Sequence, residues 1–418
     1  MPIADFAIWT IGTLATAGVI LRPFKVPEAI WAVAGAVALV ILGLLPASAA
    51  LEGVLKGVDV YLFLVGMMLL AEIARRTGLF DWLASQAAAH ARGCARRLFG
   101  LVYLVGTLVT VFLSNDATAV VLTPAVAAIA RSARISRPLP YLFICAFIAN
   151  AASFVLPISN PANLVIYADR MPPLASWLPH FALPSVLAIG ATYLILRHTQ
   201  REALQEPLAT EVTVPRLSVY GRTAAFGIAL TALGLMMASA LGKPLGLPTC
   251  LAGLATLALV SGLQRAAPWA FLREISWGII PLVAGLFVLV EGLQQSGAIH
   301  ALSEVLLHEA QRSETLTAAA SGVLIGLLSN LMNNLPAGLI AGTAVHAAQA
   351  PDNVAGAVLI GVDLGPNLSV TGSLATILWL TALRREGVHV SARDFLRLGV
   401  LVMPPALVLS LGGLLLAG

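Results

Sequence analysis

The chain has 418 residues, of which 59% are hydrophobic and only 11% are charged, whereas about 25% of residues are charged in an ordinary soluble protein. Its formal net charge of +4 is small for this length and gives no reason to expect a nucleic-acid partner. The composition therefore excludes an ordinary soluble enzyme or binding module and indicates a protein that lies in a lipid bilayer.

Apolar runs that approach the roughly 20 residues needed to cross a bilayer recur along the whole chain. The first run is preceded by neither a basic segment nor a cleavage site of small residues, so we expect it to be retained as a span. The pattern predicts an all-α polytopic membrane protein. The predicted full spans are residues 6–21, 29–45, 58–74, 140–157, 175–196, 223–241, 245–262, 277–294, 354–370 and 396–416.

Two further apolar stretches, 98–131 and 316–348, each consist of two arms around a polar tip. The arms, of roughly 14 to 17 residues, are shorter than a comfortable span. Polar groups at mid-depth are tolerated only where protein or a water-filled cavity surrounds them. Both stretches are therefore predicted to be re-entrant hairpins whose tips stop inside the protein.

The second tip, "LLSNLMNNLPAG" (327–338), places three asparagines beside a proline and a glycine. Each asparagine side chain carries N–H donors and a carbonyl acceptor that hydrocarbon cannot satisfy. One asparagine could join two helices, an interaction worth about 0.6 kcal/mol. Three of them next to helix breakers predict instead that the tip lines a cavity.

The basic residues predict the orientation of the chain. If the N-terminus lies outside and each hairpin returns to the side that it left, 20 of the 24 Lys and Arg residues fall on the cytoplasmic side. Such an excess is typical of cytoplasmic loops. Both termini are then expected outside. The basic residues left outside are Lys56, Arg170, Lys243 and Arg312.

The two halves of the chain resemble each other. The segment "LLAEIARRTGLFDWL" (69–83) matches "VLVEGLQQSGAIHAL" (288–302), "FLSN" (112–115) matches "LLSN" (327–330), and "ISNPANLVI" (158–166) matches "TGSLATILW" (371–379). The aligned pairs include Glu72 with Glu291, Gly78 with Gly297, and Asn150 with Asp363. Because each half has an odd number of crossings, the pattern predicts an inverted repeat of five spans plus one hairpin, as in secondary transporters.

This repeat predicts the domain organisation. The first repeat covers 1–196, a polar cytoplasmic linker covers 197–222, and the second repeat covers 223–418. The first repeat divides into scaffold spans (1–97), a hairpin with a broken helix (98–168) and a span (175–196). The second divides in the same way into 223–314, 315–383 and 396–416.

Four helices are predicted to begin at mid-membrane, capped by Asp116, Asn160, Asn334 and Ser373, with Pro161 in the first position of one of them. Helix N-termini offer free N–H groups and partial positive charge, and the intervening stretches 154–159 and 365–372 are expected to unwind. This arrangement predicts a substrate site of the discontinuous-helix kind. The predicted substrate-binding residues are Asn115, Thr118, Asn160, Asn163, Asn330, Asn333, Asn334, Thr371 and Ser373.

Two acidic residues are predicted to couple transport to protons. Asp116 and Asp363 fall in apolar runs, where an acid is costly and therefore usually functional. Asp116 could also be only a helix cap, and the choice between function and a simple reach to water stays open for Glu72 and Glu291. The seven histidines and three cysteines show no metal-ligand or disulfide spacing, so neither a metal nor another cofactor is expected.

The motifs "LSNDATAVVLTP", "LLSNLMNNLPAGL" and "GVDLGPNLSVTGSLATILWL" resemble those of the arsenite and antimonite efflux permeases, a branch of the ion transporter superfamily. The resemblance covers essentially the whole chain. It implies an elevator-type fold in the prokaryotic inner membrane, export of trivalent arsenic and antimony hydroxides against proton entry, and in some members a separate arsenite-stimulated ATPase. This sequence has Asn150 where an Asp is frequent and Asn367 where a Lys is frequent.

The residues fit that substrate independently of the resemblance. Arsenous acid is a neutral trihydroxide near pH 7, and uncharged amides and hydroxyls offer it hydrogen bonds. No phosphate-binding loop ending in Gly-Lys-Ser/Thr is present, so the energy must come from an ion gradient or a partner. A sodium/proton antiporter, or an anion transporter of the same superfamily, remains the alternative, and a homodimer remains open.

Overall fold

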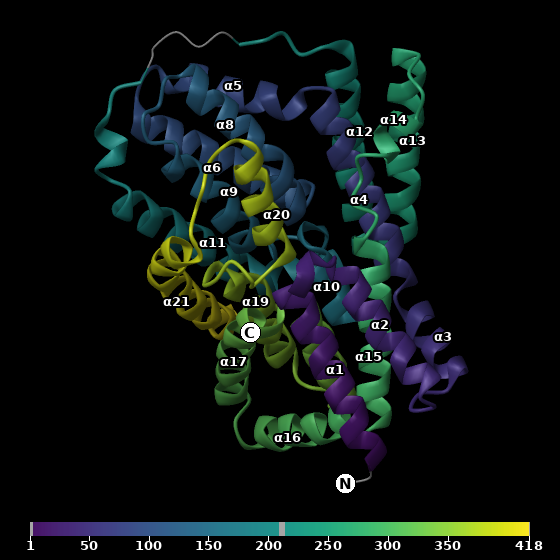
Figure 1. Cartoon of the computed structure of the whole chain (residues 1–418). Coiled ribbons are helices and arrows are strands. Elements are labelled where there is room, and N and C mark those ends of the chain that lie inside the picture. Colours follow the sequence, from purple (N-terminus) through teal and green to yellow (C-terminus); the bar gives the residue numbers. More distant parts are fainter. Residues whose placement is uncertain (1–2, 209–213, 418) are drawn as a thin grey trace.

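The computed structural model describes residues 3–208 and 214–417, and every regular element within that part of the chain is a helix (Figure 1). The elements of the first half are α1 (Ile3–Leu21), η1 (Pro23–Lys25), α2 (Glu28–Ile41), α3 (Ala47–Lys56), α4 (Val58–Arg76), α5 (Leu79–Ala91), α6 (Ala95–Phe112), α7 (Asn115–Ala117), the π-helical η2 (Thr118–Leu122), α8 (Thr123–Ser132), α9 (Leu139–Ala151), η3 (Pro157–Ser159), α10 (Pro161–Tyr167), η4 (Ala168–Arg170), α11 (Leu174–Thr199) and η5 (Ala203–Gln205).

The second half has a similar order of long and short helices. Its elements are α12 (Val219–Ala240), α13 (Gly246–Gln264), α14 (Trp269–Leu272), α15 (Ile279–Gln295), α16 (Ala298–Arg312), α17 (Glu314–Met332), α18 (Asn334–Ala347), α19 (Asp352–Leu364), η6 (Gly365–Asn367), α20 (Leu374–Arg385) and α21 (Ala392–Ala417).

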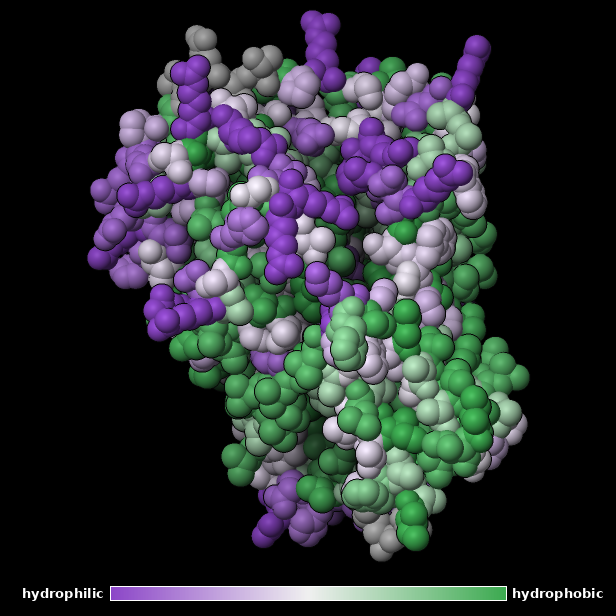
Figure 2. Space-filling model, in the orientation of Figure 1, coloured by the Kyte–Doolittle hydropathy of each residue, from purple (hydrophilic) through white to green (hydrophobic). Residues whose placement is uncertain are grey.

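The apolar helices confirm that the chain is a multi-pass membrane protein. Seven described helices are long and apolar enough to cross a membrane, and the number rises to nine if two bent helix pairs each count as one span. Figure 2 shows hydrophilic residues concentrated at the end of the molecule where α5 lies and α12 begins, with a mostly hydrophobic surface below it. A surface of that kind needs lipid rather than water around it.

The hairpin arms are longer than the sequence predicted. The first arms, α6 and α17, have 18 and 19 residues, and both are long enough to cross a membrane. The prediction counted only the apolar run, whereas each helix continues into polar residues: α6 begins at Ala95, before Arg96 and Arg97, and α17 begins at Glu314. In both stretches the helix is interrupted at the polar tip and a new helix, α7 or α18, begins within two residues. α18 packs against α17, the arm that precedes it.

Two predicted full spans are shorter than expected. The spans 140–157 and 354–370 end early as α9 and α19, which have 13 residues each. The helix ends at Ala151, six residues before Pro157, in the first case and just before Gly365 and Pro366 in the second, and the chain restarts as α10 and α20. The breaks at 154–159 and 365–372 therefore lie where the sequence predicted them. α2 is also shorter than the predicted span 29–45.

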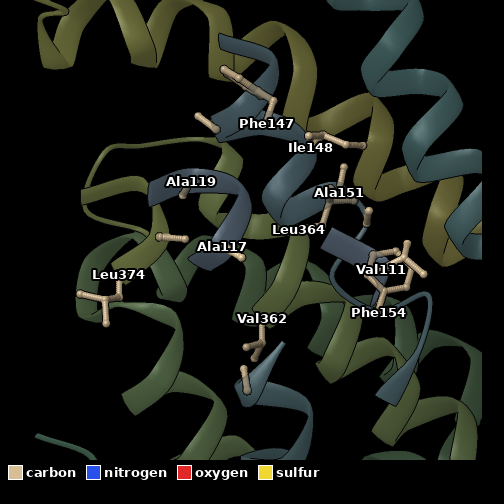
Figure 3. Close-up of a cluster of buried hydrophobic side chains, with 14 of the residues drawn as sticks. Val111, Ala117, Ala119, Phe147, Ile148, Ala151, Phe154, Val362, Leu364 and Leu374 are labelled. Atoms are coloured by element: carbon tan, nitrogen blue, oxygen red, sulfur yellow. The ribbon is translucent and has the colours of Figure 1, made fainter. Parts of the chain in front are cut away.

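Two groups of helices stand side by side. In one group α4 packs along α13, and α15 packs along α2; in the other, α17 packs along α19, and α11 along α21 (Figure 1). The broken helices and the hairpins belong mainly to the second group. Buried side chains fill the space around the breaks, among them Phe147, Ile148 and Ala151 of α9 and Val362 and Leu364 of α19 (Figure 3).

Glycines mark two matching bends. Gly78 between α4 and α5 and Gly297 between α15 and α16 have φ values of 74° and 78°, in the left-handed region that glycine adopts without strain. These are the glycines that the sequence aligned. The axis of α16 turns 74° from that of α15, so α16 runs across the ends of its neighbours (Figure 1).

Candidate functional site

Four helix starts meet at one place inside the protein. α7 follows Ser114, α10 follows Asn160, α18 follows Asn333 and α20 follows Ser373. Each preceding residue caps the helix, because its side-chain oxygen accepts a backbone N–H at 3.0 to 3.3 Å: from Ala117, Ala162, Leu335 and Thr376, respectively. Four sets of free helix N–H groups are thereby aimed at the same region.

Two of the predicted caps are wrong. Ser114, rather than Asp116, caps α7, because its extended backbone (φ −172°) places its hydroxyl opposite the N–H of Ala117. Asn333, rather than Asn334, caps α18 from a left-handed backbone (φ 72°) that turns the hairpin in a single residue. The caps Asn160 and Ser373 lie where the sequence predicted them.

A small cavity of about 20 Å³ lies where these helices begin. Space of this size holds about one water molecule, so the helix starts are closely packed in this conformation. None of the residues that line it is Lys, Arg or His. The lining residues are Leu64, Asn115, Asp116, Asn160, Pro161, Ile279, Asn334, Leu335, Leu374 and Ala375.

Asn160 connects this cavity to a buried acid. Its Nδ2 donates to Oδ1 of Asp363 at 2.7 Å, while its own Oδ1 caps α10. Asp363 is 0% exposed, and its second oxygen, Oδ2, has no hydrogen-bond partner among the described residues. One asparagine therefore holds both the start of a broken helix and a carboxyl group directly behind the cavity wall.

Asp116 differs from Asp363 in its surroundings. It is half-buried, and it is one of the residues that line the cavity. Its backbone N–H donates to Oδ1 of Asn115 at 2.9 Å, whereas its carboxyl group makes no hydrogen bond to any described residue. Asp116 therefore leaves its side chain free to face whatever enters the cavity.

A second buried polar cluster occupies the matching position in the other half. Asn150 and Asp363 are each the second-to-last residue of a 13-residue helix, α9 and α19. Oδ1 of Asn150 accepts from Oγ of Ser373 at 3.3 Å, and its Nδ2 donates to Oδ1 of Asn367 at 3.0 Å. Asn367 donates in turn to the carbonyl of Phe147 at 3.0 Å. Asn150 and Asn367 thus form a neutral hydrogen-bonded pair.

Several predicted binding residues face away from the cavity. Thr118 bonds to Oγ1 of Thr110 on α6 at 2.8 Å. Asn163 donates to the carbonyls of Ser153, Leu156 and Pro157, so it satisfies the unwound stretch behind α10. Their contacts are those of structural residues.

Asn330 and Thr371 tie the second hairpin to the second break. Nδ2 of Asn330 donates to the carbonyls of Gly326 and Gly365, and its Oδ1 accepts from Ser369. The hydroxyl of Thr371 donates to the carbonyl of Asn330 at 3.0 Å. The sequence match of "FLSN" with "LLSN" aligns two asparagines that occupy different places in the fold, because Asn330 lies inside α17 whereas Asn115 begins α7.

The two aligned glutamates are ion-paired. Glu72, 7% exposed, accepts from Nε and a terminal nitrogen of Arg75 at 2.7 Å, and Glu291, 8% exposed, accepts from Nζ of Lys56 at 2.7 Å. Neither glutamate lines the cavity. The sequence also missed Leu64 and Ile279, which close the cavity from α4 and α15 and which no sequence pattern distinguishes from their apolar neighbours.

The comparisons with known proteins agree with this architecture. A family model described as "Citrate transporter" matches residues 14–362. The chain belongs to the citrate transporter family. It is therefore a multi-pass membrane transporter, and the helices that surround the cavity are the helices of a transport protein.

Several relatives bear the name that the motifs predicted. Proteins named "Arsenical pump membrane protein" from Yersinia enterocolitica and from Escherichia coli K12 are each 27% identical to the chain, over 84% of its length and 85% of theirs. An uncharacterized transporter of Mycobacterium tuberculosis is 26% identical, over 84% of each chain. The resemblance to the arsenical permeases is thus confirmed.

A solved structure has the same fold. The YdaH transporter of Alcanivorax borkumensis, whose topology is described as unusual, superposes with a TM-score of 0.59 at 18% identity. The match covers 88% of this chain and 86% of that one. At this identity the likeness concerns the fold alone.

Proposed function

We propose that the chain exports trivalent arsenic and antimony hydroxides in exchange for protons and so confers resistance to arsenicals. The observation that carries the proposal is a cavity at four helix starts whose lining includes Asn115, Asn160 and Asn334 and no Lys, Arg or His. The relatives named arsenical pump membrane proteins support the same substrate.

The chemistry of the lining favours a neutral solute over citrate. Arsenous acid has three hydroxyl groups, each able to donate to an amide oxygen and to accept an N–H. Citrate carries several carboxylates, which proteins usually bind through Arg or Lys. A cavity of about 20 Å³ is smaller than either solute, so binding requires the helix starts to move apart.

The acids supply the coupling in this proposal. Charge on a fully buried carboxyl is expensive in a membrane, which favours a group that gains and loses a proton during the cycle. Asp363 communicates with the cavity through Asn160, which binds its Oδ1. Asp116 faces the cavity directly, and Asp116 or Asp363 carries the proton that enters as arsenous acid leaves.

We infer that the chain is an inverted repeat that works as an elevator. Matching hydrogen bonds between the halves support the repeat: Asp363 with Asn160, and Asn150 with Ser373. In this mechanism the scaffold spans 1–97 and 223–314 stay fixed. The hairpins, the broken helices and the last span of each repeat move with the solute, and the contacts of Asn330 hold the second hairpin and break together.

Proton entry provides enough energy. One proton crossing roughly 150 mV yields about 3.5 kcal/mol, which sustains a gradient of a neutral solute of a few hundredfold. The setting is the prokaryotic inner membrane with both termini outside. A separate arsenite-stimulated ATPase and a second copy of the chain are the partners that the proposal admits.

A sodium/proton antiporter is the competing function, because two carboxyl groups near broken-helix carbonyls also suit a cation. Everted membrane vesicles distinguish the two. The proposal expects arsenite to accumulate when the interior is acidified and expects added sodium to release no protons. Proton efflux driven by sodium, without arsenite accumulation, would replace it with the antiporter.

A further inference from the structure

A large apolar groove lies between α16 and the hairpin of α17 and α18. It encloses about 680 Å³, within the ~300–1,000 Å³ range of small-molecule sites. Its rim is open, because Leu302 and Val305 of α16 and Leu324 of α17 are 49%, 64% and 56% exposed. In a membrane-spanning chain, such a rim faces lipid.

The helix that covers the groove, α16, runs across the molecule rather than along its neighbours. α16 turns 74° from α15 and lies across the neighbouring helix ends (Figure 1). It presents Leu302, Val305 and Leu306 to the groove, whereas His300 and Glu304 pair with each other in solvent, at 3.2 Å and 76% and 68% exposed. An amphipathic helix of this kind lies in the interface, with lipid chains beneath it.

One cation stands at the mouth of the groove. Arg312, the last residue of α16, is the one basic residue among those that line the groove. Its Nη1 lies 3.3 Å from Oε1 of Glu309, but both side chains are largely exposed, at 69% and 49%. An exposed pair of this kind contributes about 0–1 kcal/mol, so a phosphate group can displace the glutamate from the guanidinium.

The groove reaches the tip of the hairpin. Leu328, Met332 and Ile340 line it and also line a second apolar groove of about 450 Å³ between the hairpin, α1 and α15. Apolar space therefore borders the hairpin on two sides. Met332 immediately precedes Asn333, which caps the helix that begins at the transport cavity.

We propose that this groove binds one phospholipid of the surrounding bilayer, with its phosphate at Arg312 and an acyl chain between α16 and the hairpin of α17 and α18. Lipid chains fill the membrane on the open side, and most of the lining residues are apolar. The charged residues of the lining, Glu309 and Arg312, mark the headgroup end. The site is separate from the transport cavity and does not depend on the identity of the transported solute.

The other half of the chain offers a matched control. A groove of about 490 Å³ lies between α5, α6 and α12. In the proposed repeat, these helices correspond to helices that line the lipid groove and the 450 Å³ groove beside it. Its lining contains no charged residue. We expect it to hold acyl chains without selecting a phosphate.

Native mass spectrometry of the delipidated full-length protein tests the site with added phosphatidylglycerol and, in parallel, with a diacylglycerol of the same chains. Ala320→Trp fills the lipid groove from an exposed position and is expected to remove one retained phosphatidylglycerol. Arg312→Gln is expected to weaken phosphatidylglycerol binding about tenfold, about 1.4 kcal/mol, and to leave diacylglycerol binding unchanged.

Two controls make the result specific. Ala229→Trp fills the uncharged groove, and Lys243→Gln removes another exposed cation. Both are expected to retain the phosphatidylglycerol that depends on Arg312. Wild-type occupancy in Ala320→Trp and Arg312→Gln would overturn the proposal, as would equal losses in the two controls. Should Ala320→Trp fail to fold, Arg312→Gln decides alone, because its side chain lies at the surface.

Discussion

Replacing Asp363 by asparagine tests the proposed coupling most directly. The side chain is 0% exposed, Oδ1 accepts from Asn160 at 2.7 Å, and Oδ2 has no partner among the described residues. An amide has the same shape, so its oxygen can keep the bond to Asn160, but it cannot release a proton. The variant therefore resembles the protonated state permanently.

The expected magnitudes follow from this geometry. An acid at the centre of a membrane helix costs about 2.5–3.5 kcal/mol on insertion scales, and replacement by an amide removes that cost. The hydrogen bond from Asn160 to a neutral acceptor is weaker than the bond to a carboxylate by about 1 kcal/mol, which is less than the cost removed. Folded stability is therefore not expected to fall. Accumulation is expected to collapse, because the roughly 3.5 kcal/mol supplied by one proton is no longer coupled to the solute.

Arsenite uptake into everted vesicles, measured against interior pH, provides the assay. Asp363→Asn is expected to abolish uphill uptake and to preserve counterflow, in which labelled and unlabelled arsenite exchange. Asp352→Asn, at the exposed start of the same helix, serves as the control and is expected to behave as wild type. Uphill uptake with the wild-type pH dependence in Asp363→Asn would refute the assignment.

Four further variants test the rest of the site. Asp116→Asn should also uncouple uptake if Asp116 carries the proton, and α7 should stay intact because Ser114 caps that helix. A normal pH profile of uptake in vesicles would leave Asp116 with no coupling role. Asn160→Ala removes a helix cap and a hydrogen bond to a buried acid, together about 2–4 kcal/mol, and should abolish export; normal resistance in this variant would contradict a role for Asn160 in the site. Asn330→Ala loses only structural hydrogen bonds, so it should lower the melting temperature and reduce transport in proportion to the loss of folded protein. A variant with all three cysteines replaced should still transport arsenite in the same vesicles, because none of them lines the cavity; a folded but inactive variant would require a thiolate site instead.

The sequence predicted the elements of the site better than their individual roles. Proline and glycine at mid-membrane located both helix breaks, because a residue that cannot continue a helix leaves a local signal. The positions of the helix starts followed from the same residues. Asn160 and Ser373 were recognisable as caps because each directly precedes a helix-compatible run.

The partners of each side chain could not be predicted in the same way. Asn160 meets Asp363 across 203 positions of sequence, and Asn330 meets Gly365 and Ser369 across more than 30, so these contacts depend on how the helices pack. Asparagine suits a cavity wall and a backbone clamp equally well, since it carries the same donors and acceptor in both. Residue type and position beside a helix start or hairpin tip predicted Asn163 and Asn330 as cavity residues, whereas in this conformation their amide N–H groups donate to backbone carbonyls.

The two halves use similar hydrogen bonds but differ in charge, and this difference bears on the coupling. Asp363 binds the cap of α10, and Asn150 binds the cap of α20, but only the first of these positions holds an ionisable group. A carboxyl group at both positions would place a third acid, in addition to Asp116 and Asp363, at one small cavity, where mutual repulsion would favour protonation of one of them. With asparagine at 150, a change in charge behind the cavity wall acts on the start of α10 alone. In the proposed cycle, the first broken helix therefore responds to the proton, while the neutral cluster of Asn150, Asn367 and Ser373 keeps the second broken helix in place.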